Sequence, residues 1–328
     1  MDIIMTNTKG EEYGYLDADS VDMEIGDTND FEIQVGIDTY NPSIHSVGCL
    51  AICPGMEWGG KVTLRNPHGK TLTLKGPTWR GMLAQKVLSP PDGADYLYAD
   101  GEAHEVIRNL MGDQFGSMFS VSDEISRYRI RSYRFSRYIT FLDGITGMLK
   151  SVGAKMQISY QQGPPNGVGY VQLSAVPIID YSSRIEINGD DGMQFNVTEN
   201  RGGINHLICL GSGELKYRQV VHLYASPGGQ VGATQYYKGE NERVAVYDYP
   251  NAEDDLTLIA DGKKRLRELM DSKECSASVT TDIQMEIGDI IGGRERITNT
   301  AVKVPVVRKI LKIQDGTESI EYKLKGEA

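Results

Sequence analysis

A chain of 328 residues, with 24% charged and 40% hydrophobic side chains, has the size and composition of a soluble globular protein of roughly two to three domains. Its 34 basic and 45 acidic residues give a net charge of −11, which argues against a protein whose main task is to grip the phosphates of nucleic acid. Residues 1–14 lack the apolar core of a secretory signal, and no run of about 18 apolar residues exists, so we expect no membrane insertion by this chain.

Residues 1–98 predict strands and a first β-barrel-like domain. Apolar and polar residues alternate over 21–25 and over 31–35, so each segment has one buried face and one solvated face. A hairpin is expected over 61–76, because two alternating runs flank the turn sequence Asn-Pro-His-Gly. The sequence Pro-Pro-Asp-Gly at 90–93 then marks the end of the domain.

Residues 99–183 predict a small α/β domain. Apolar side chains recur over 103–111 with the three- and four-residue spacing of one helix face. A second amphipathic helix is expected over 141–152, where Thr140 and Asp143 have the spacing of a capping pair. Two strands follow, over 154–160 and 168–176.

Residues 184–275 predict a second α/β domain, and residues 276–328 a second β-barrel-like domain. A helix is expected from Asp254 or Asp255 onward, because apolar residues recur along one side of the segment that follows. Strand patterns over 200–225 are candidates to join the last barrel, so the boundary between these two domains is soft. Few helices in the middle and β-rich ends indicate an α+β fold, with two β-barrel-like domains and small α/β domains between them.

The hairpins at 61–76 and 309–326 resemble each other. Each has an alternating strand, a polar turn with Gly, a second alternating strand and the ending Leu-Lys-Gly. If both lie in similar domains, the chain carries two copies of one module, and three chains can form a ring that looks six-fold. The alternative is that any two amphipathic hairpins look alike.

The sequence contains no motif that marks a catalytic, metal or cofactor site. A phosphate-binding loop, a His-Glu-x-x-His helix and a Gly-x-Ser-x-Gly elbow are all absent. Cys49 and Cys53 lack two further ligands at zinc-site spacing, so reduced core cysteines are expected. His206 and His222 flank apolar strand positions and are expected to be structural. We therefore assign no catalytic residue, metal ligand or cofactor, and predict that the chain is not an enzyme.

Six residues are candidates for contacts with partners: Trp58, Trp79, Arg80, Arg127, Arg129 and Arg131. The tryptophans fit either a buried core or an interface, because Trp and Arg are enriched at the residues that dominate binding energy. On a strand, the three alternating arginines would share one face. That face fits an acidic neighbour or second subunit, a plain solvated surface, or nucleic acid, which the net charge disfavours.

Five segments together resemble a known family. They are 27–33, 57–62, 75–84, 288–295 and 307–324, and they follow the family's order along nearly the whole chain. The block Gly-Pro-Thr-Trp-Arg-Gly-Met-Leu-Ala is the most specific, whereas the others are loose strand patterns. On these residues the sequence resembles the hub portion of the tail-tip or baseplate hub proteins of phages and prophages of Gram-positive bacteria, the siphovirus tail-associated protein family.

The resemblance implies a homotrimer in which two β-barrel domains per chain form a pseudo-hexameric ring. Such a ring would join the hexameric tail tube or distal tail protein to a three-fold tip fibre or spike, and DNA would pass through its lumen without specific binding. The expected location is the virion tail, after synthesis in the host bacterial cytoplasm. Many family members continue into a long C-terminal extension, whereas this chain ends at Ala328, so wall digestion and receptor binding are expected of other proteins.

Two other functions stay open. A tail-associated cell-wall hydrolase would need two carboxylates at a set separation, and paired acids such as Asp190 and Asp191 are abundant. A carbohydrate- or receptor-binding tail module would show an exposed aromatic platform. The candidates for such a platform are Tyr236, Tyr237, Tyr247 and Tyr249.

Overall fold

The computed structural model describes residues 1–328 except 165–166, 183–185, 188–193, 253, 281–283, 295–296, 298–300, 315 and 328. The chain divides into two compact units. The first comprises Met1–Phe195 and Ala277–Lys325, and the second comprises Asn196–Ser276 and Gly326–Ala328.

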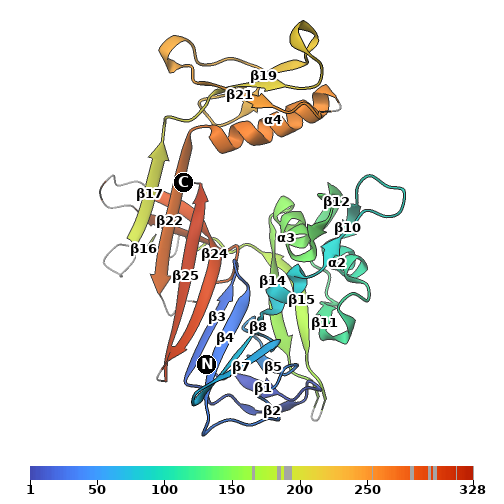
Figure 1. Ribbon diagram of the computed structural model, residues 1–328, viewed down its shortest axis with the longest axis vertical. Helices are drawn as coiled ribbons and strands as arrows, with labels where there is room; N and C mark the ends of the chain where they lie inside the picture. Colours follow the sequence, from blue (N-terminus) through green and yellow to red (C-terminus); the bar gives the residue numbers. More distant parts are fainter. Residues whose placement is uncertain are drawn as a thin grey trace. The chain divides into compact units, whose positions relative to one another are not determined.

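The largest sheet contains ten strands (Figure 1). Its main row runs in the pairing order β17–β22–β25–β24–β3–β4–β8–β7, while β23 pairs with β24 and β16 pairs with β23. The strands are β3 (Ser20–Ile25), β4 (Asp30–Gly36), β7 (Leu64–His68), β8 (Thr71–Pro77), β16 (Glu186–Ile187), β17 (Gln194–Asn200), β22 (Ser272–Thr280), β23 (Ile290–Arg294), β24 (Ala301–Gln314) and β25 (Thr317–Glu327).

A four-stranded sheet in the order β2–β1–β5–β6 shares one hydrophobic core with β3, β4 and β8. Its strands are β1 (Ile4–Thr6), β2 (Glu12–Tyr15), β5 (Leu50–Ile52) and β6 (Gly59–Lys61). The predicted alternation over 21–25 and 31–35 is confirmed, since the apolar residues of both segments are at most 3% exposed. The pairing of the described strands leaves both sheets open. The chain is mostly β-sheet with a few helices, which confirms the α+β class. The barrel-like form and the domain boundaries at 98, 183 and 275 stay predictions.

The prediction that the two similar hairpins occupy equivalent places in separate modules is wrong. Hairpin β7–β8 lies at one end of the ten-stranded sheet, whereas hairpin β24–β25 lies in its middle. There β24 pairs with β3, from Lys309 opposite Ile25 to Gln314 opposite Ser20. The β24–β3 pair lies at the middle of the row of eight strands. The hairpin β24–β25 lies on one side of this contact, and the equivalent position on the other side is occupied by β3–β4. Alternation fixes which face of a hairpin is buried, but it does not fix the neighbouring strands.

An α/β module follows the first hairpin within the first unit. Its helices are α1 (Trp79–Ala84), α2 (Ala103–Met111) and α3 (Phe141–Ser151). Its strands are β9 (Val87–Leu88), β10 (Tyr98–Glu102), β11 (Phe119–Val121), β12 (Arg129–Arg134), β13 (Ile139–Thr140), β14 (Ala154–Gln161) and β15 (Tyr170–Pro177). They form the sheets β11–β15–β14, β10–β12 and β9–β13.

Helices α2 and α3 confirm the predicted periodicity, and α1 was not predicted. The Thr140 hydroxyl accepts a hydrogen bond from the backbone N–H of Asp143 at 3.1 Å, which confirms the predicted cap of α3. Residues of α2 and α3 share a core with one face of the β11–β15–β14 sheet, and Val171 and Leu173 are fully buried there. The alternate residues of β14 and β15 therefore lie on the opposite face of this sheet.

The second unit combines a four-stranded sheet with one helix, which lies along one face of the sheet (Figure 1). The elements are β18 (His206–Leu210), β19 (Val220–Ala225), β20 (Val231–Gly232), β21 (Val244–Asp248) and α4 (Asp255–Leu269), and the sheet order is β20–β19–β18–β21. Asp254 caps α4 as predicted, by accepting from the N–H of Thr257 at 2.7 Å. Gly262 is required inside α4, because a Cβ there would lie 2.5 Å from the sulfur of Cys209. Short 3-10 turns cover Gly116–Met118, Leu215–Tyr217 and Gly239–Asn241.

Candidate functional site

Three of the six candidate interface residues lie inside the first unit. Trp79 is fully buried, and Trp58 and Arg80 are 4% and 5% exposed. The Trp79 ring stacks on Tyr160 with 6.0 Å between ring centroids and meets Phe119 edge to face at 6.4 Å. A partner could reach none of these three side chains in this conformation. Their burial favours the core interpretation, and the interface interpretation stays a prediction.

A buried ionic cluster explains why Arg80 is inside. Its Nε donates to Oε1 of Glu57 at 2.5 Å, and the second oxygen of Glu57 lies 3.2 Å from Nζ of Lys309. Lys309 also donates to the carboxylate of Glu286, and its Nζ lies 4.9 Å from the centroid of the Trp58 ring. Two cations and two carboxylates thus alternate, so the charges of the cluster balance.

A second buried ion pair extends this cluster. Nζ of Lys155, on β14, lies 2.5 Å from Oδ1 of Asp289. The other oxygen of Asp289 accepts from the backbone N–H of Glu286 at 2.9 Å, and Oδ1 also accepts from that of Ile179 at 3.0 Å. These contacts tie the turn at 286–289 to the α/β module and to β24, so segments from the start, middle and end of the chain meet here.

Opposite charges outweigh burial at the centre of the cluster. Burial alone would raise the pKa of Glu57, but the charges of Arg80 and Lys309 lower that pKa to about 2. Burial also disfavours the charged form of Lys309, yet Glu57 and Glu286 raise its pKa. The contribution of Glu57 to stability is therefore present above its ordinary pKa of 4.5 and is lost as the pH falls toward 2.

The other three candidates, Arg127, Arg129 and Arg131, are exposed. Arg129 and Arg131 lie on β12 and flank the fully buried Ile130, so these two share one face as predicted. Arg127 precedes the strand with φ of 66°, so the prediction that all three share a strand face is wrong for Arg127. The one ion pair among them within the described part of the chain joins Arg129 to Asp100 at 4.0 Å.

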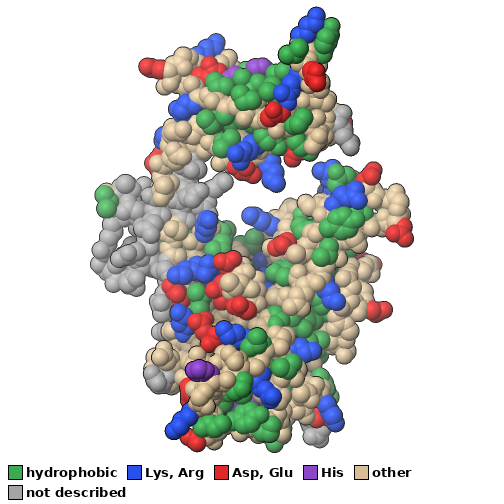
Figure 2. Space-filling model, viewed as in Figure 1, with side chains coloured by type: hydrophobic (Ala, Val, Ile, Leu, Met, Phe, Trp, Pro, Cys, Tyr) green, Lys and Arg blue, Asp and Glu red, His purple; other side chains and the backbone are tan. Residues whose placement is uncertain are grey.

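Carboxylates gather on the polar face of β3 and β4 (Figure 2). Asp22 and Glu24 alternate with the core residues of β3, and Asp30 and Glu32 do so on β4. They line a shallow groove of about 600 Å³. Burial raises the pKa of Asp22, Lys312 opposes this, and the neighbouring carboxylates add to it. Lys75 and Lys312 line the same groove, and Lys75 pairs with Glu32 at 2.6 Å, so the four carboxylates exceed the lysines by two negative charges.

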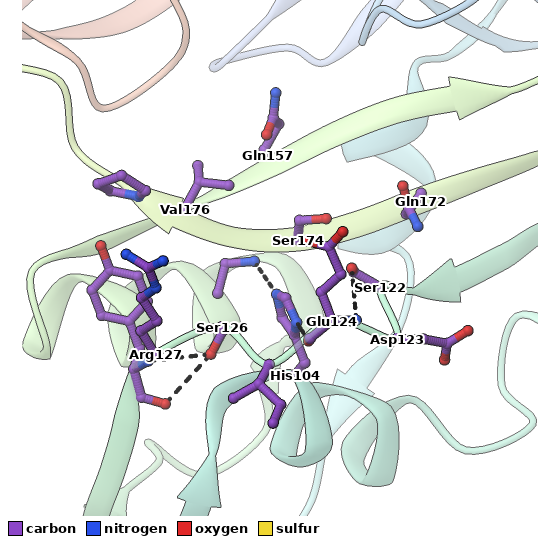
Figure 3. Close-up of a pocket in the computed structure, with 14 residues that line it drawn as sticks. His104, Ser122, Asp123, Glu124, Ser126, Arg127, Gln157, Gln172, Ser174 and Val176 are labelled. Carbon is purple, nitrogen blue, oxygen red and sulfur yellow. Dashed lines mark hydrogen bonds between the residues drawn. The ribbon is translucent and has the colours of Figure 1, made fainter.

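An open pocket of about 760 Å³ in the first unit lies between the β14–β15 face and the loop at 122–128 (Figure 3). His104 forms part of its lining and uses both ring nitrogens. Its Nε2 accepts from the N–H of Ala175 at 2.7 Å, so its Nδ1 carries the proton and donates to the carbonyl of Glu124 at 2.6 Å. His104 thus has a structural role that links α2, the loop and β15.

In the second unit, His206 is hydrogen-bonded on both sides. Its Nδ1 lies 2.7 Å from the carboxylate of Glu242, and its Nε2 lies 2.8 Å from Nδ1 of His222. The predicted structural role is thereby supported for His206, whereas His222 is exposed. Tyr247 and Tyr249 stack at 6.0 Å and pack against the core of the unit, so they form no open platform.

The described residues offer no site for a metal ion. Among them, no group of three or more His, Cys, Asp or Glu side chains is placed to hold one. Cys49, Cys53 and Cys209 are free and buried, as predicted, and the side chain of Cys275 lies outside the described part of the chain. None of the helices in the described part of the chain combines the length and apolar composition needed to cross a bilayer.

Comparison with known structures identifies the fold. Prophage tail protein gp18 from Listeria monocytogenes EGD-e matches with a TM-score of 0.53 at 14% identity, over 99% of this chain and 94% of that chain. The 43 kDa tail protein of prophage MuSo2 from Shewanella oneidensis matches with a TM-score of 0.56 at 11% identity, over 99% and 98%. A chain of the phage P2 virion baseplate in its activated conformation matches with a TM-score of 0.55 at 9% identity, over 98% of both.

The chain thus has the fold of phage tail and baseplate proteins, along nearly its whole length. The resemblance inferred from the five sequence segments is confirmed at this level. No protein-family model matches the sequence, and no curated protein matches it. Because a fold does not by itself establish a function, the function has to be inferred from this chain's own residues.

Proposed function

We propose that this chain is a structural, non-catalytic hub of a phage-type tail, which works as a homotrimer. The observation that carries the proposal is the strand order of the large sheet. Its main row has three strands on either side of the antiparallel β24–β3 pair, and the hairpins β24–β25 and β3–β4 have equivalent positions on the two sides of the β24–β3 contact. Two like halves in one chain let three chains present six similar units to a hexameric tube.

In this proposal the acidic face of β3 and β4 lines the lumen. Asp22, Glu24, Asp30 and Glu32 would repel DNA phosphates, so that the genome passes without binding. The tail tube or distal tail protein would lie on one side of the ring, and a tip fibre or spike on the other. The protein would then be made in the host bacterial cytoplasm and reside in the virion tail, as its fold likeness to tail proteins supports.

The exposed arginines supply a contact between subunits. Arg129 and Arg131 point away from the core of a chain whose net charge is −11, so an acidic surface of a second copy is the available partner of opposite charge. Arg127, beside the strand, adds a third positive charge to the same edge of the module.

Electron microscopy of the concentrated, purified chain tests this function. We expect ring-shaped particles with three-fold averages and a central opening. The double variant Arg129→Glu with Arg131→Glu should lower the fraction of rings at least about tenfold, because like charges then face each other. The matched control, Lys9→Glu with Lys150→Glu, reverses two exposed charges elsewhere and should leave the rings intact. Particles with two-fold symmetry would contradict the hub, and unchanged rings in the arginine variant would remove the arginines from the contact.

A further inference from the structure

The pocket beside His104 presents hydrogen-bonding groups that the chain itself does not use (Figure 3). Gln157 and Ser174 are opposite one another on β14 and β15, and Gln172 lies two residues along β15. All three belong to the sheet face turned away from the core formed with α2 and α3. Within the described part of the chain, these side chains have no hydrogen-bond partner. They form a row of uncharged donors and acceptors that line the pocket.

The opposite wall is held rigidly. The hydroxyl and backbone N–H of Ser126 both donate to the carboxylate of Glu102, the residue that caps α2. Although burial opposes it, hydrogen bonds to Ser126 and to backbone N–H groups lower the pKa of Glu102 to about 2. Arg108 donates to the carbonyl of Ser122 at 2.9 Å. The backbone of the wall is therefore held at Ser122 and Ser126 before a ligand binds, which lowers the cost of ordering it.

The backbone of this wall is strained at the pocket. Arg127 has φ of 66°, an uncommon conformation for a residue with a side chain, and it lines the pocket together with Tyr128. Strain of this kind persists where the surrounding structure enforces it, and it clusters at active sites, ligand clamps and switch regions. The strain thus adds a second, independent observation at the same place as the unused polar groups.

The chemistry of the lining selects among ligands. An anionic ligand would face the carboxylates of Asp123 and Glu124, and an apolar ligand would cover the amides of Gln157 and Gln172 without pairing them. Most strand residues of the lining belong to β15, which is paired on both sides, with β11 and β14, and therefore offers no free edge for an added peptide strand. A neutral, hydroxyl-rich ligand meets these groups best, because each hydroxyl both donates and accepts, as do the amides of Gln157 and Gln172.

We propose that this pocket is a binding site for a neutral oligosaccharide. The row of Gln157, Ser174 and Gln172 hydrogen-bonds the sugar hydroxyls from one side. Glu124 and Arg127 do so from the other side, while Tyr128 and Val176 contact the apolar faces of the sugar rings. The site lies in a different part of the first unit from the row of strands that carries the hub proposal, and Arg127 is the residue that it shares with the proposed contact between subunits.

The test is calorimetric titration of the full chain with maltotetraose and with chitotetraose. We expect at least one of them to bind with a dissociation constant of about 1 mM or tighter. The double variant Gln157→Met with Gln172→Met keeps the side-chain volumes and should weaken that binding at least about tenfold, because each lost hydrogen bond leaves a hydroxyl unpaired. The control Gln85→Met changes an exposed glutamine outside the pocket and should bind as the unaltered chain does.

Three results would overturn the site. One is the absence of binding by both oligosaccharides, and another is binding that the double variant leaves unchanged. The third is loss of oligomer in the double variant without any binding in the unaltered chain, which would make the pocket a contact between subunits. Circular dichroism of each variant confirms that it is folded before titration.

Discussion

Replacement of Lys309 by Met is expected to lower the free energy of unfolding by about 3–5 kcal/mol. The substitution removes the cation that lies between Glu57 and Glu286, both of which contact its ammonium group. Two carboxylates would then face each other, and Glu57 is only 2% exposed. Arg80 still pairs with Glu57, so the cluster is left with two carboxylates and one cation, and the surplus negative charge makes removal of one partner costly. Chemical denaturation, followed by circular dichroism, measures the change.

The matched control is Lys312→Met on the same strand. Lys312 is exposed on the polar face, so its replacement should change stability by no more than about 0.5 kcal/mol. Equal effects of the two substitutions would mean that the buried cluster contributes nothing particular to the fold. A variant of Lys309 as stable as the unaltered chain would contradict the arrangement of Glu57, Arg80 and Glu286 described above.

Replacement of Trp79 by Ala is expected to cost about 3–5 kcal/mol of stability, as is usual for the loss of a fully buried tryptophan. Trp79 is completely buried between Tyr160 and Phe119, so its removal leaves a cavity and ends both aromatic contacts. Thermal or chemical denaturation of the variant gives the change. The same measurement separates the core role of Trp79 from the interface role that the sequence left open.

Tyr138→Ala is the control for this substitution, because Tyr138 is 64% exposed. Its loss should alter stability by no more than about 0.5 kcal/mol. A Trp79→Ala chain that kept its full stability but failed to assemble would restore the interface interpretation. A chain that lost stability in proportion to the buried ring would exclude it.

The local elements were predictable from the sequence. The helix over 103–111 follows from the spacing of its apolar residues. The helix over 141–151 follows from the same spacing and from the cap formed by Thr140 with the N–H of Asp143, three residues later. The strands over 21–25 and 31–35 follow from strict alternation, since one face of each must be buried. Each of these signals lies within a few residues, so tertiary structure had little opportunity to overrule it.

The contacts between distant segments were not predictable. Arg80 is buried because Glu57 neutralises it, while Lys309, more than two hundred residues further on, completes the cluster. No local pattern marks such a partner, so Arg80 was equally compatible with a surface contact. Helix α1 was missed for the same reason, since it is short and its burial of Trp79 depends on the neighbouring module.

The pocket lay outside sequence reasoning as well. Its polar row alternates with core residues of β14 and β15, and such alternation is also typical of a plain solvated face. What distinguishes it is the loop at 122–128, which His104 and Glu102 hold opposite the sheet. The order of strands in the large sheet could not be predicted from the hairpin patterns either. The patterns predicted the strands of both hairpins correctly, but they wrongly made β7–β8 the equivalent of β24–β25.

The central claim is that three copies of this chain form a closed ring. Native mass spectrometry of the purified protein over a range of concentrations tests it most directly. The account predicts a species near three times 36.2 kDa that gains population as the concentration rises. A stable dimer that persists at every concentration would contradict the account, because two-fold closure is incompatible with an adaptor between six-fold and three-fold parts of a tail.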